Sequence, residues 1–509
     1  MQVASDRAQA ADVGTPWLMA WRVPLLLALC IVIGVAEWHA LRAGHFFNED
    51  YAVYLQEALN LLHGRRLDAM GFVQWFDPSR PINLNGPLMY PPLAPALYAL
   101  PLMAFGLDIA ALKLFQVALF AAGLAAAGAL MLRRRFSLSE TALALIVCAV
   151  CPETLSAINS IGSDLPFMLP LALGMLGIDW YYGSDPGRRP VGRAVVLALL
   201  MLAAADTRIV GAMLVPTSVV VGWLRRRGRC TAMVLLPAVL CAALWLVQTT
   251  LLRGAGDVVS ILHYRFFDAA NVATQLVYGL VNPYRGSALD HWALPALAVL
   301  AASAVPALLA DLRAASPIAW YLALYSALLL ALPNIDAGAR YLLPHLLFLG
   351  AYVARGGATV AAWLRGRAAA PVAGVVAGGA LAVLFAAAPA ELAWTALPVG
   401  SGTANARAVF AAVQRLVPPD GIVAVSKPRS FHLFTGRTTI TPPYAATAAA
   451  LQVWLAARHV SAFVVKHSAY AVRYDYADCP RLAACPAGTL AGWRVAYRNP
   501  DFLLLLRQD

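Results

Sequence analysis

The chain has 509 residues, of which 61% are hydrophobic and only 13% are charged. Soluble globular proteins contain about 45–50% apolar and about 25% charged residues, so this composition, with a mean hydropathy of +0.69, excludes a soluble protein. Unbroken apolar runs such as LFAAGLAAAGALML exclude an outer-membrane β-barrel, whose strands alternate apolar and polar residues. We therefore predict an all-α polytopic membrane protein.

The net charge of +12 comes from arginines in short loops between apolar runs, as expected for membrane orientation and not for a nucleic-acid surface. We expect eleven membrane-spanning helices, near residues 23–36, 109–132, 140–158, 165–182, 194–206, 207–224, 231–251, 292–310, 316–333, 342–362 and 371–392. Alternate loops carry the arginines, for example Arg133–Arg135 and Arg225–Arg227. The N terminus is therefore expected in the cytoplasm, and the loops 43–106 and 253–291 outside it.

The tail changes character after residue 398. Short strand patterns such as IVAV, SAFVV and FLLLLR alternate with helical patterns such as TANARAVFAAVQRLV and ATAAALQVWLAARH. This alternation predicts a small external α/β domain at 399–509, beside a transmembrane domain at 1–398. Cys479 and Cys485 in the tail either form a disulfide bond, if the compartment is oxidising, or are ordinary thiols.

The first external loop carries two neighbouring acids, Glu49 and Asp50. Apolar residues then follow at helical spacing until Gly64, which predicts an amphipathic helix lying on the membrane with both acids in its first turn. Acids at this position either serve the helix dipole, with Asn48 as the cap, or line a functional cavity.

Further polar residues are expected on the same external face. Asp164, in the sequence Gly-Ser-Asp-Leu-Pro, either caps the next helix or is functional. Arg340 and Tyr341 either anchor a span at the interface or bind a ligand. Asp206 and Arg208 lie where two short spans meet and could form an internal ion pair.

Several of these segments together resemble the GT-C integral-membrane glycosyltransferases. They are EDYAVYLQEALNLLHG, YPPLAPALYALPLMAFG, GSDLP, ARYLLP and the α/β tail. The chain is most similar to the bacterial group that uses polyprenyl-phosphate sugars, which includes protein O-mannosyltransferase-like and aminoarabinose-transferase-like enzymes. The resemblance implies transfer of a sugar, with inversion, from a polyprenyl-phosphate donor to a hydroxyl of an envelope acceptor at the periplasmic side of the bacterial plasma membrane.

The resemblance also implies roles for individual residues. Asp50 is the principal catalytic acid with Glu49 beside it, and Asp164 is a second acid of the same cavity. Arg340, with Tyr341, faces the donor phosphate. A divalent metal ion between Asp50 and Asp164 stays open, as does the choice of Glu49 or Asp50 as the base.

Two other classes compete with this interpretation. A transporter or lipid flippase would account for the span number and for intramembrane polar residues such as Lys113, Asp179 and Asp206, but the sequence shows no internal repeat. A receptor that binds a partner through its tail is the third possibility. None of these residues identifies the sugar or the acceptor.

Overall fold

A computed structural model describes most of the chain. The described residues are 16–47, 50–67, 69–73, 90–183, 190–226, 231–253, 274, 277, 280, 282–284, 287–331, 338–387, 399–442, 448–466 and 492–508. Glu49, Cys479 and Cys485 lie outside them. The chain divides into two compact units: the first contains residues 1–40, 116–158 and 163–395, and the second contains residues 41–115, 159–162 and 396–509.

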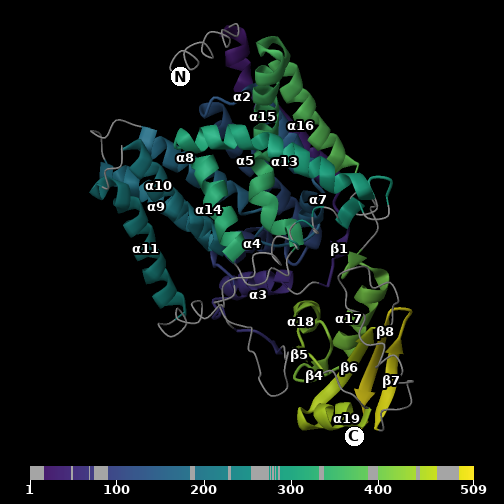
Figure 1. The fold of residues 1–509 in the computed structure, drawn as a ribbon. Coiled ribbons are helices and arrows are strands. Elements are labelled where there is room, and N and C mark those ends of the chain that lie inside the picture. The colour runs from purple at the N-terminus through teal and green to yellow at the C-terminus, as the bar shows by residue number, and fades with distance from the viewer. Residues whose placement is uncertain are drawn as a thin grey trace. The chain divides into compact units, whose positions relative to one another are not determined.

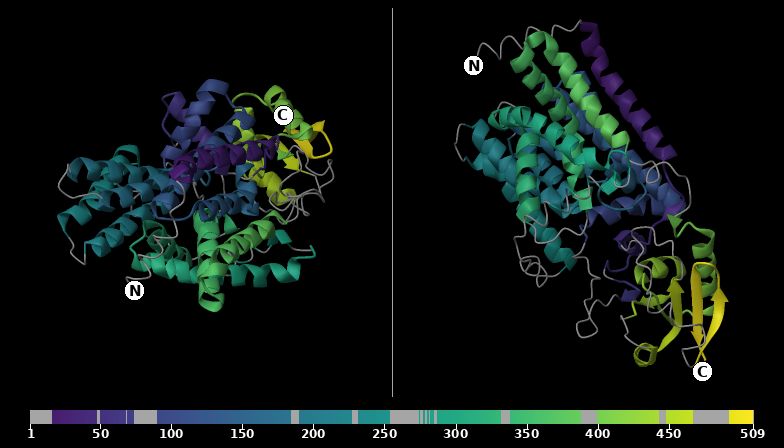
Figure 2. Two further views of the ribbon diagram at one scale, coloured as in Figure 1. Left: turned by 90° about the horizontal axis from the view of Figure 1, so that it is seen from above. Right: turned by 45° about the vertical axis from the view of Figure 1, so that its right-hand side comes forward.

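The first unit is helical (Figures 1 and 2). Its elements are α2 (Pro16–His39), most of α5 (Ile109–Arg133), α6 (Leu138–Val150), α7 (Pro152–Ile158), α8 (Met168–Gly183), α9 (Pro190–Thr207), η2 (Ile209–Met213), α10 (Leu214–Arg225), α11 (Ala232–Arg253), η4 (Asn282–Tyr284), α13 (Asp290–Arg313), α14 (Pro317–Ala331), η5 (Gly338–Leu342), α15 (Leu343–Arg365), η6 (Arg367–Ala369) and α16 (Ala370–Ala386).

Four helices among the described residues are long and apolar enough to cross a membrane: Trp21–His39, Ile109–Arg133, Asp290–Arg313 and Arg340–Arg365. The pair α6 and α7 adds a fifth span if the 60° bend between them is counted as one broken helix. Five shorter apolar helices accompany them, at Leu93–Phe105, Ile209–Arg225, Ala232–Gln248, Pro317–Ala331 and Ala370–Ala386. The protein is therefore a multi-pass membrane protein, whereas the predicted count of eleven spans is not confirmed.

Helix α15 packs closely against three neighbours, α6, α13 and α16. A Cβ atom at Gly350 would come within 2.8 Å of the Ala144 backbone on α6, and one at Gly356 would collide with the Ser303 carbonyl on α13. Small residues allow helices to approach in this way, and within membranes such packing replaces the hydrophobic effect as the cause of association. The green helices α15 and α16 run side by side in Figures 1 and 2.

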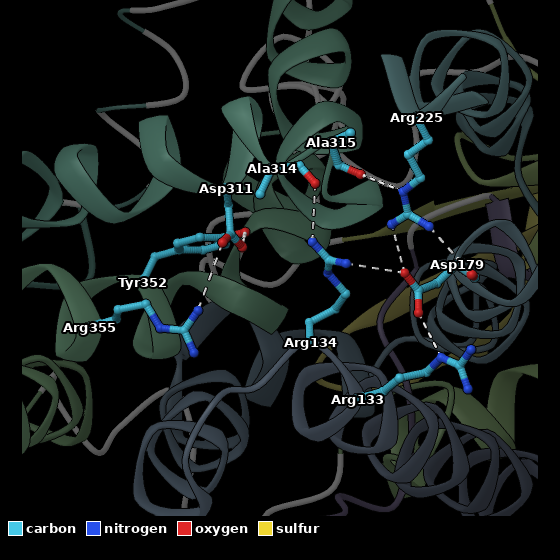
Figure 3. A network of polar contacts seen from close by, with 9 residues as sticks. All are labelled: Arg133, Arg134, Asp179, Arg225, Asp311, Ala314, Ala315, Tyr352 and Arg355. Carbon is cyan, nitrogen blue, oxygen red and sulfur yellow. Dashed lines mark hydrogen bonds and ion pairs between the residues drawn. The ribbon is translucent and has the colours of Figure 1, made fainter. Parts of the chain in front are cut away.

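One carboxylate, that of Asp179 on α8, joins the ends of several helices in the first unit (Figure 3). Arg133 Nε lies 2.7 Å from Asp179 Oδ2, and Arg225 Nη2 and Arg134 Nη1 lie 2.8 and 3.4 Å from Oδ1. Arg225 and Arg134 also donate to the carbonyls of Ala315 and Ala314, just beyond α13. Because α5, α8, α10 and α13 all end near this group, the positive charge in excess of Asp179 is offset by the negative ends of the helix dipoles.

The second unit contains α3 (Asp50–Leu62), α4 (Leu93–Phe105), the start of α5 and the described part of the tail. The tail elements are β3 (Val399–Gly400), α17 (Ala404–Leu416), β4 (Ile422–Ala424), α18 (Pro428–Thr435), β5 (Thr438–Ile440), α19 (Ala448–Ala457), β6 (Val460–Lys466), β7 (Trp493–Arg498) and β8 (Phe502–Arg507). Five of these strands and β2 (Phe72–Val73) form a six-stranded sheet in the order β2-β5-β4-β6-β8-β7, parallel from β2 to β6 and antiparallel from β6 to β7; Figure 1 shows the tail strands of this sheet.

Both faces of this sheet are covered, because its strands place successive side chains on opposite sides. Val464 and Leu504 belong to the cluster that α17 and α18 complete, and Val465 and Leu505 belong to the cluster that α19 completes. A run such as FLLLLR therefore indicates a strand buried on both faces.

Two strands of this unit come from the loop 43–106, which the sequence pattern assigned to the transmembrane domain at 1–398. Strand β1 (Gly44–His45) pairs in parallel with β3, and β2 (Phe72–Val73) pairs in parallel with β5 as the edge of the sheet. Gly44 has φ +77° and a Cβ atom there would collide with the backbone of Gly402, so only glycine allows this crossing. The first loop and the tail thus fold together as one unit.

Candidate active site

Asp50, the predicted catalytic acid, is the first residue of α3 and lies in a cluster of polar and aromatic side chains. The Tyr90 hydroxyl donates a 2.7 Å hydrogen bond to Asp50 Oδ1. Arg429 Nη1 lies 3.9 Å from the same oxygen, and the Asp50 side chain is 42% exposed. Because an acid in the first turn also suits the helix dipole, that interpretation and the functional one are compatible. Asp50 is thus a carboxylate held by two neighbours and open to solvent.

Tyr90 supports Asp50 from the segment that precedes α4. Its ring lies 4.3 Å from that of Tyr54, one turn along α3 from Asp50. Burial, with a further contribution from the Asp50 charge, raises the pKa of Tyr90 well above its usual range. The hydroxyl therefore stays protonated and acts as a donor at all physiological pH values. EDYAVY and YPPLAP, two segments that carried the resemblance, meet here.

Arg429 was not predicted: it follows the strand pattern IVAV, and no role was assigned to any residue of the tail. Arg429 lies in a helix, α18, which begins with Pro428 and ends at Thr435; Gly436, just past its end, is in the left-handed conformation with φ 68°. Proline at the start and glycine just past the end of a run are the signals that could have identified it. The guanidinium lies 5.8 Å from the centre of the Phe72 ring, and the side chain is only 4% exposed.

Helix α3 itself is more deeply buried than an amphipathic surface helix. Tyr51, Tyr54, Leu55 and Ala58 belong to one cluster that also contains side chains from α4 and Leu433 from α18. The prediction of a helix after Asp50 is therefore confirmed, and that of one polar face is wrong, since consecutive residues from Tyr51 to Ala58 are buried.

The chain before α3 is fixed by His45, which is fully buried. Its Nδ1 donates to the carbonyl of Phe46, and its Nε2 accepts from the backbone N–H of Ile161; each hydrogen bond is 2.7 Å long. The ring stacks on Tyr51 at 3.7 Å. Burial, with a smaller contribution from Lys113, lowers the pKa of His45 to about 3. The imidazole is therefore neutral, with the proton on Nδ1.

The backbone just before His45 is held by Lys113 of α5 and by Asn159, which directly follows α7. Lys113 Nζ donates to the carbonyls of Arg42 and Gly44, and Asn159 Oδ1 accepts from the N–H of Arg42. The buried lysine thus supplies a donor to two backbone carbonyls.

A second cluster, in the first unit, contains the other predicted residues. Arg208 forms an ion pair with Asp164, and its guanidinium lies 4.9 Å from the centre of the Tyr341 ring. Arg340 lies 5.7 Å from the same ring, and Tyr325 donates a 2.8 Å hydrogen bond to the Tyr341 carbonyl. Two guanidinium groups therefore share one aromatic ring beside a carboxylate.

Arg208 was expected to pair with Asp206, and its ion pair with Asp164 was not predicted. It follows α9 directly and reaches Asp164, a partner 44 positions earlier. The interpretation of Asp164 as a helix cap is wrong, because α8 begins only at Met168. Glu153 of α7 adds a second acid, which interacts electrostatically with both Asp164 and Arg340. Asp164, Arg340 and Tyr341 thus lie in one cluster with Arg208, and their roles stay a prediction.

A metal site between Asp50 and Asp164 stays a prediction. Within the described ranges, no three His, Cys, Asp or Glu side chains gather as metal ligands do. The Asp164 carboxylate is engaged by Arg208, which suits an ion pair and competes with a cation.

Comparison with known proteins decides the fold. No family model and no curated protein sequence matches the chain. Among solved structures, ArnT from Cupriavidus metallidurans bound to undecaprenyl phosphate superposes with a TM-score of 0.56 at 14% identity, over 97% of this chain and 98% of that one. The archaeal oligosaccharyltransferase AglB from Archaeoglobus fulgidus, in complex with an inhibitory peptide and a dolichol-phosphate, gives 0.57 at 12% identity, over 88% and 70%. The chain has the GT-C fold.

The arabinofuranosyltransferase AftD from Mycobacteria shares this fold with a TM-score of 0.56 at 15% identity, over 96% of this chain but 40% of its own. The resemblance found in the sequence is therefore confirmed at the level of the GT-C fold. At these identities, the likeness assigns no residue roles. The roles of the two clusters must come from their chemistry.

Proposed function

We propose that this GT-C protein is a membrane glycosyltransferase that moves a sugar from a polyprenyl-phosphate donor to a hydroxyl group of a cell-envelope acceptor. The observation that carries the proposal is the Asp50 carboxylate, exposed at the start of α3 and held by the Tyr90 hydroxyl. In this proposal the N terminus is cytoplasmic and the unit that contains α3 and the tail is periplasmic.

Asp50 acts as the general base. The acceptor hydroxyl attacks the anomeric carbon while the bond from that carbon to the phosphate oxygen breaks, and the hydroxyl proton passes to Asp50. The leaving group is already a stable phosphate anion, so no second acid is required to protonate it, unlike in a glycosidase. Base assistance of this kind contributes about 10²–10⁴-fold to the rate. Attack opposite the leaving group inverts the anomeric configuration.

Arg340 and Arg208 bind the donor phosphate in this proposal. Guanidinium groups donate paired hydrogen bonds to phosphate oxygens and remain charged at any relevant pH, and the Tyr341 ring holds both of them. Asp164 orients Arg208 until the phosphate arrives. The apolar isoprenoid chain lies among membrane helices, which is the environment that its solubility demands.

Lys113 and Asp179, which a transporter would use as intramembrane charges, both have structural partners. Lys113 satisfies two backbone carbonyls, and Asp179 binds three arginines. Charged residues within a membrane are candidate transport residues, and the contacts of Lys113 and Asp179 give both of them a structural role instead.

The test is transfer by the purified protein. Reconstituted protein receives a panel of radiolabelled undecaprenyl-phosphate sugars and a cell-envelope extract, and released undecaprenyl phosphate is measured. We expect one donor to be consumed by the native protein and the rate to fall at least about 100-fold in Asp50→Asn. Asp108→Asn, an exposed acid at the start of α5, is the matched control and should retain full activity. Full activity of folded Asp50→Asn would remove Asp50 from the mechanism.

A further inference from the structure

The tail contacts both helix α3, which begins with Asp50, and the residues just before it. Phe47, three residues before Asp50, inserts its ring among Phe410, Phe431 and Phe502 of the tail. Leu433 of α18 packs into the α3–α4 cluster from the same helix that carries Arg429. Tail residues therefore contact the chain just before α3, through Phe431, and α3 itself, through Leu433.

We propose that Arg429 is a positioning residue for the catalytic carboxylate, so that the tail completes the active site instead of only adjoining it. The inference rests on the proposed function, because it acts through Asp50. Its basis is the convergence of a buried guanidinium and a tyrosine hydroxyl on one carboxylate oxygen, Asp50 Oδ1.

Two observations indicate that Arg429 is placed for this purpose. The first is burial: a guanidinium that is 4% exposed must be compensated, and an ion pair with a carboxylate does so. The second is rigidity. Phe431 and Leu433 anchor α18 in two separate clusters, and the His432 ring hydrogen-bonds the Arg437 carbonyl 2.8 Å away. Arg429 therefore presents its charge from a fixed point.

The contact also explains how Asp50 can be both exposed and oriented. A distance of 3.9 Å is longer than a hydrogen bond. Arg429 therefore attracts the Asp50 carboxylate but does not occupy a lone pair that the carboxylate needs to accept a proton. Tyr90 supplies the short directional bond to the same oxygen. The two groups together select one rotamer of Asp50, and a base must be held within a fraction of an ångström to work.

The experiment separates turnover from donor binding. In Arg429→Met we expect kcat to fall about 10-fold or more, since misplacement of a catalytic group by 1 Å can cost about 100-fold, while the donor KM changes less than about threefold. Arg429→Lys retains the charge and should recover part of kcat. Equal activity in Arg429→Met and the native protein would overturn the inference.

Arg437→Met is the matched control, because Arg437 follows the same helix and its guanidinium donates to backbone carbonyls of the tail, those of Val417 and Gln414. We expect it to lower the melting temperature and leave kcat unchanged. If it lowers kcat as much as Arg429→Met at matched loss of stability, the effect is one of tail folding and the inference is wrong.

A double-mutant cycle shows whether Arg429 acts through Asp50. In an Asp50→Asn background, Arg429→Met or Arg429→Lys should reduce the residual rate no further, and an undiminished additional loss would contradict the inference. If Arg429→Met does not fold, Arg429→Lys and the cycle built on it decide the question. An inactive native protein would count against the proposed function, whereas active protein with a dead Asp50→Asn and a normal Arg429→Met would count only against Arg429.

Discussion

The Lys113 ammonium donates a 2.6 Å hydrogen bond to the carbonyl of Gly44, from within an apolar helix to the strand that leads to Asp50. A second bond, of 2.9 Å, goes to the carbonyl of Arg42. Lys113→Met should therefore leave two buried carbonyls without their donor and lower folding stability by about 2 kcal/mol, a typical value for bonds to a charged group. Thermal melting in detergent measures the loss. Leu114→Ala, at the neighbouring 45% exposed position, should have little effect, and an equal loss there would contradict this explanation.

The ion pair of Arg208 and Asp164 predicts unequal effects of single and double substitutions. Both side chains are largely buried, at 12% and 15% exposure. Arg208→Met leaves the carboxylate without its guanidinium and should destabilise by about 2–4 kcal/mol, a little less than for a fully buried pair. The double variant Arg208→Met with Asp164→Asn should be more stable than Arg208→Met alone. Additive losses in melting experiments would show that the pair is not coupled.

The arginines around Asp179 should differ in importance according to their burial. The Arg225 side chain is 15% exposed and that of Arg133 is 49% exposed, although both bind the same carboxylate. Arg225→Met should cost about 2 kcal/mol or more and Arg133→Met less than about 1 kcal/mol, because solvent screens an exposed pair. Asp179→Asn should lower the stability more than either arginine substitution. A larger loss for Arg133→Met would reverse the expected order.

His45 predicts a loss of stability in acid. Its folded pKa of about 3 lies below the ordinary value of 6.5. Above pH 6.5 neither the folded nor the unfolded chain binds a proton at this position; between pH 6.5 and 3 only the unfolded chain does, so the free energy of unfolding falls as the pH falls. One such group contributes at most about 1.4 kcal/mol per pH unit.

The measurement compares melting temperatures of native protein and His45→Gln from pH 7.5 to 4. Glutamine can also donate and accept a hydrogen bond but does not titrate, so the native curve should fall more steeply. Parallel curves would show that His45 is protonated without cost in the folded state.

Local sequence patterns predicted the helices well and their partners poorly. The apolar runs marked a helix near each of the eleven expected spans, yet only four or five helices among the described residues are both long and apolar enough to cross a membrane; the run 140–158 is bent, and the run 207–224 includes a 3₁₀ turn. Hydropathy measures how apolar a segment is, and it carries no information on where proline or packing breaks it.

The candidate site divides in the same way. Asp50, Asp164, Arg340 and Tyr341 were recognisable because scarce polar residues interrupt apolar segments. Arg429 and the pairing of Arg208 with Asp164 were not, since an arginine near a helix end is ordinary in a membrane protein and only the tertiary contacts reveal Asp50 and Asp164 as their partners. Glu49 lies outside the described residues, so the choice between Glu49 and Asp50 as the base stays a prediction.

The pairing of β2 with β5 constrains the order in which the protein can assemble. Phe72 lies opposite Thr439, and a ribosome must synthesise the intervening membrane helices before that partner exists. During this time the short strand is exposed without its neighbour, and its loop must wait outside the membrane while the remaining helices insert. Closing so long a loop is slow and leaves an unpaired edge open to aggregation. The edge of the sheet can therefore be completed only after the intervening membrane helices have been made, and a chain interrupted before β5 would lack the partner of β2.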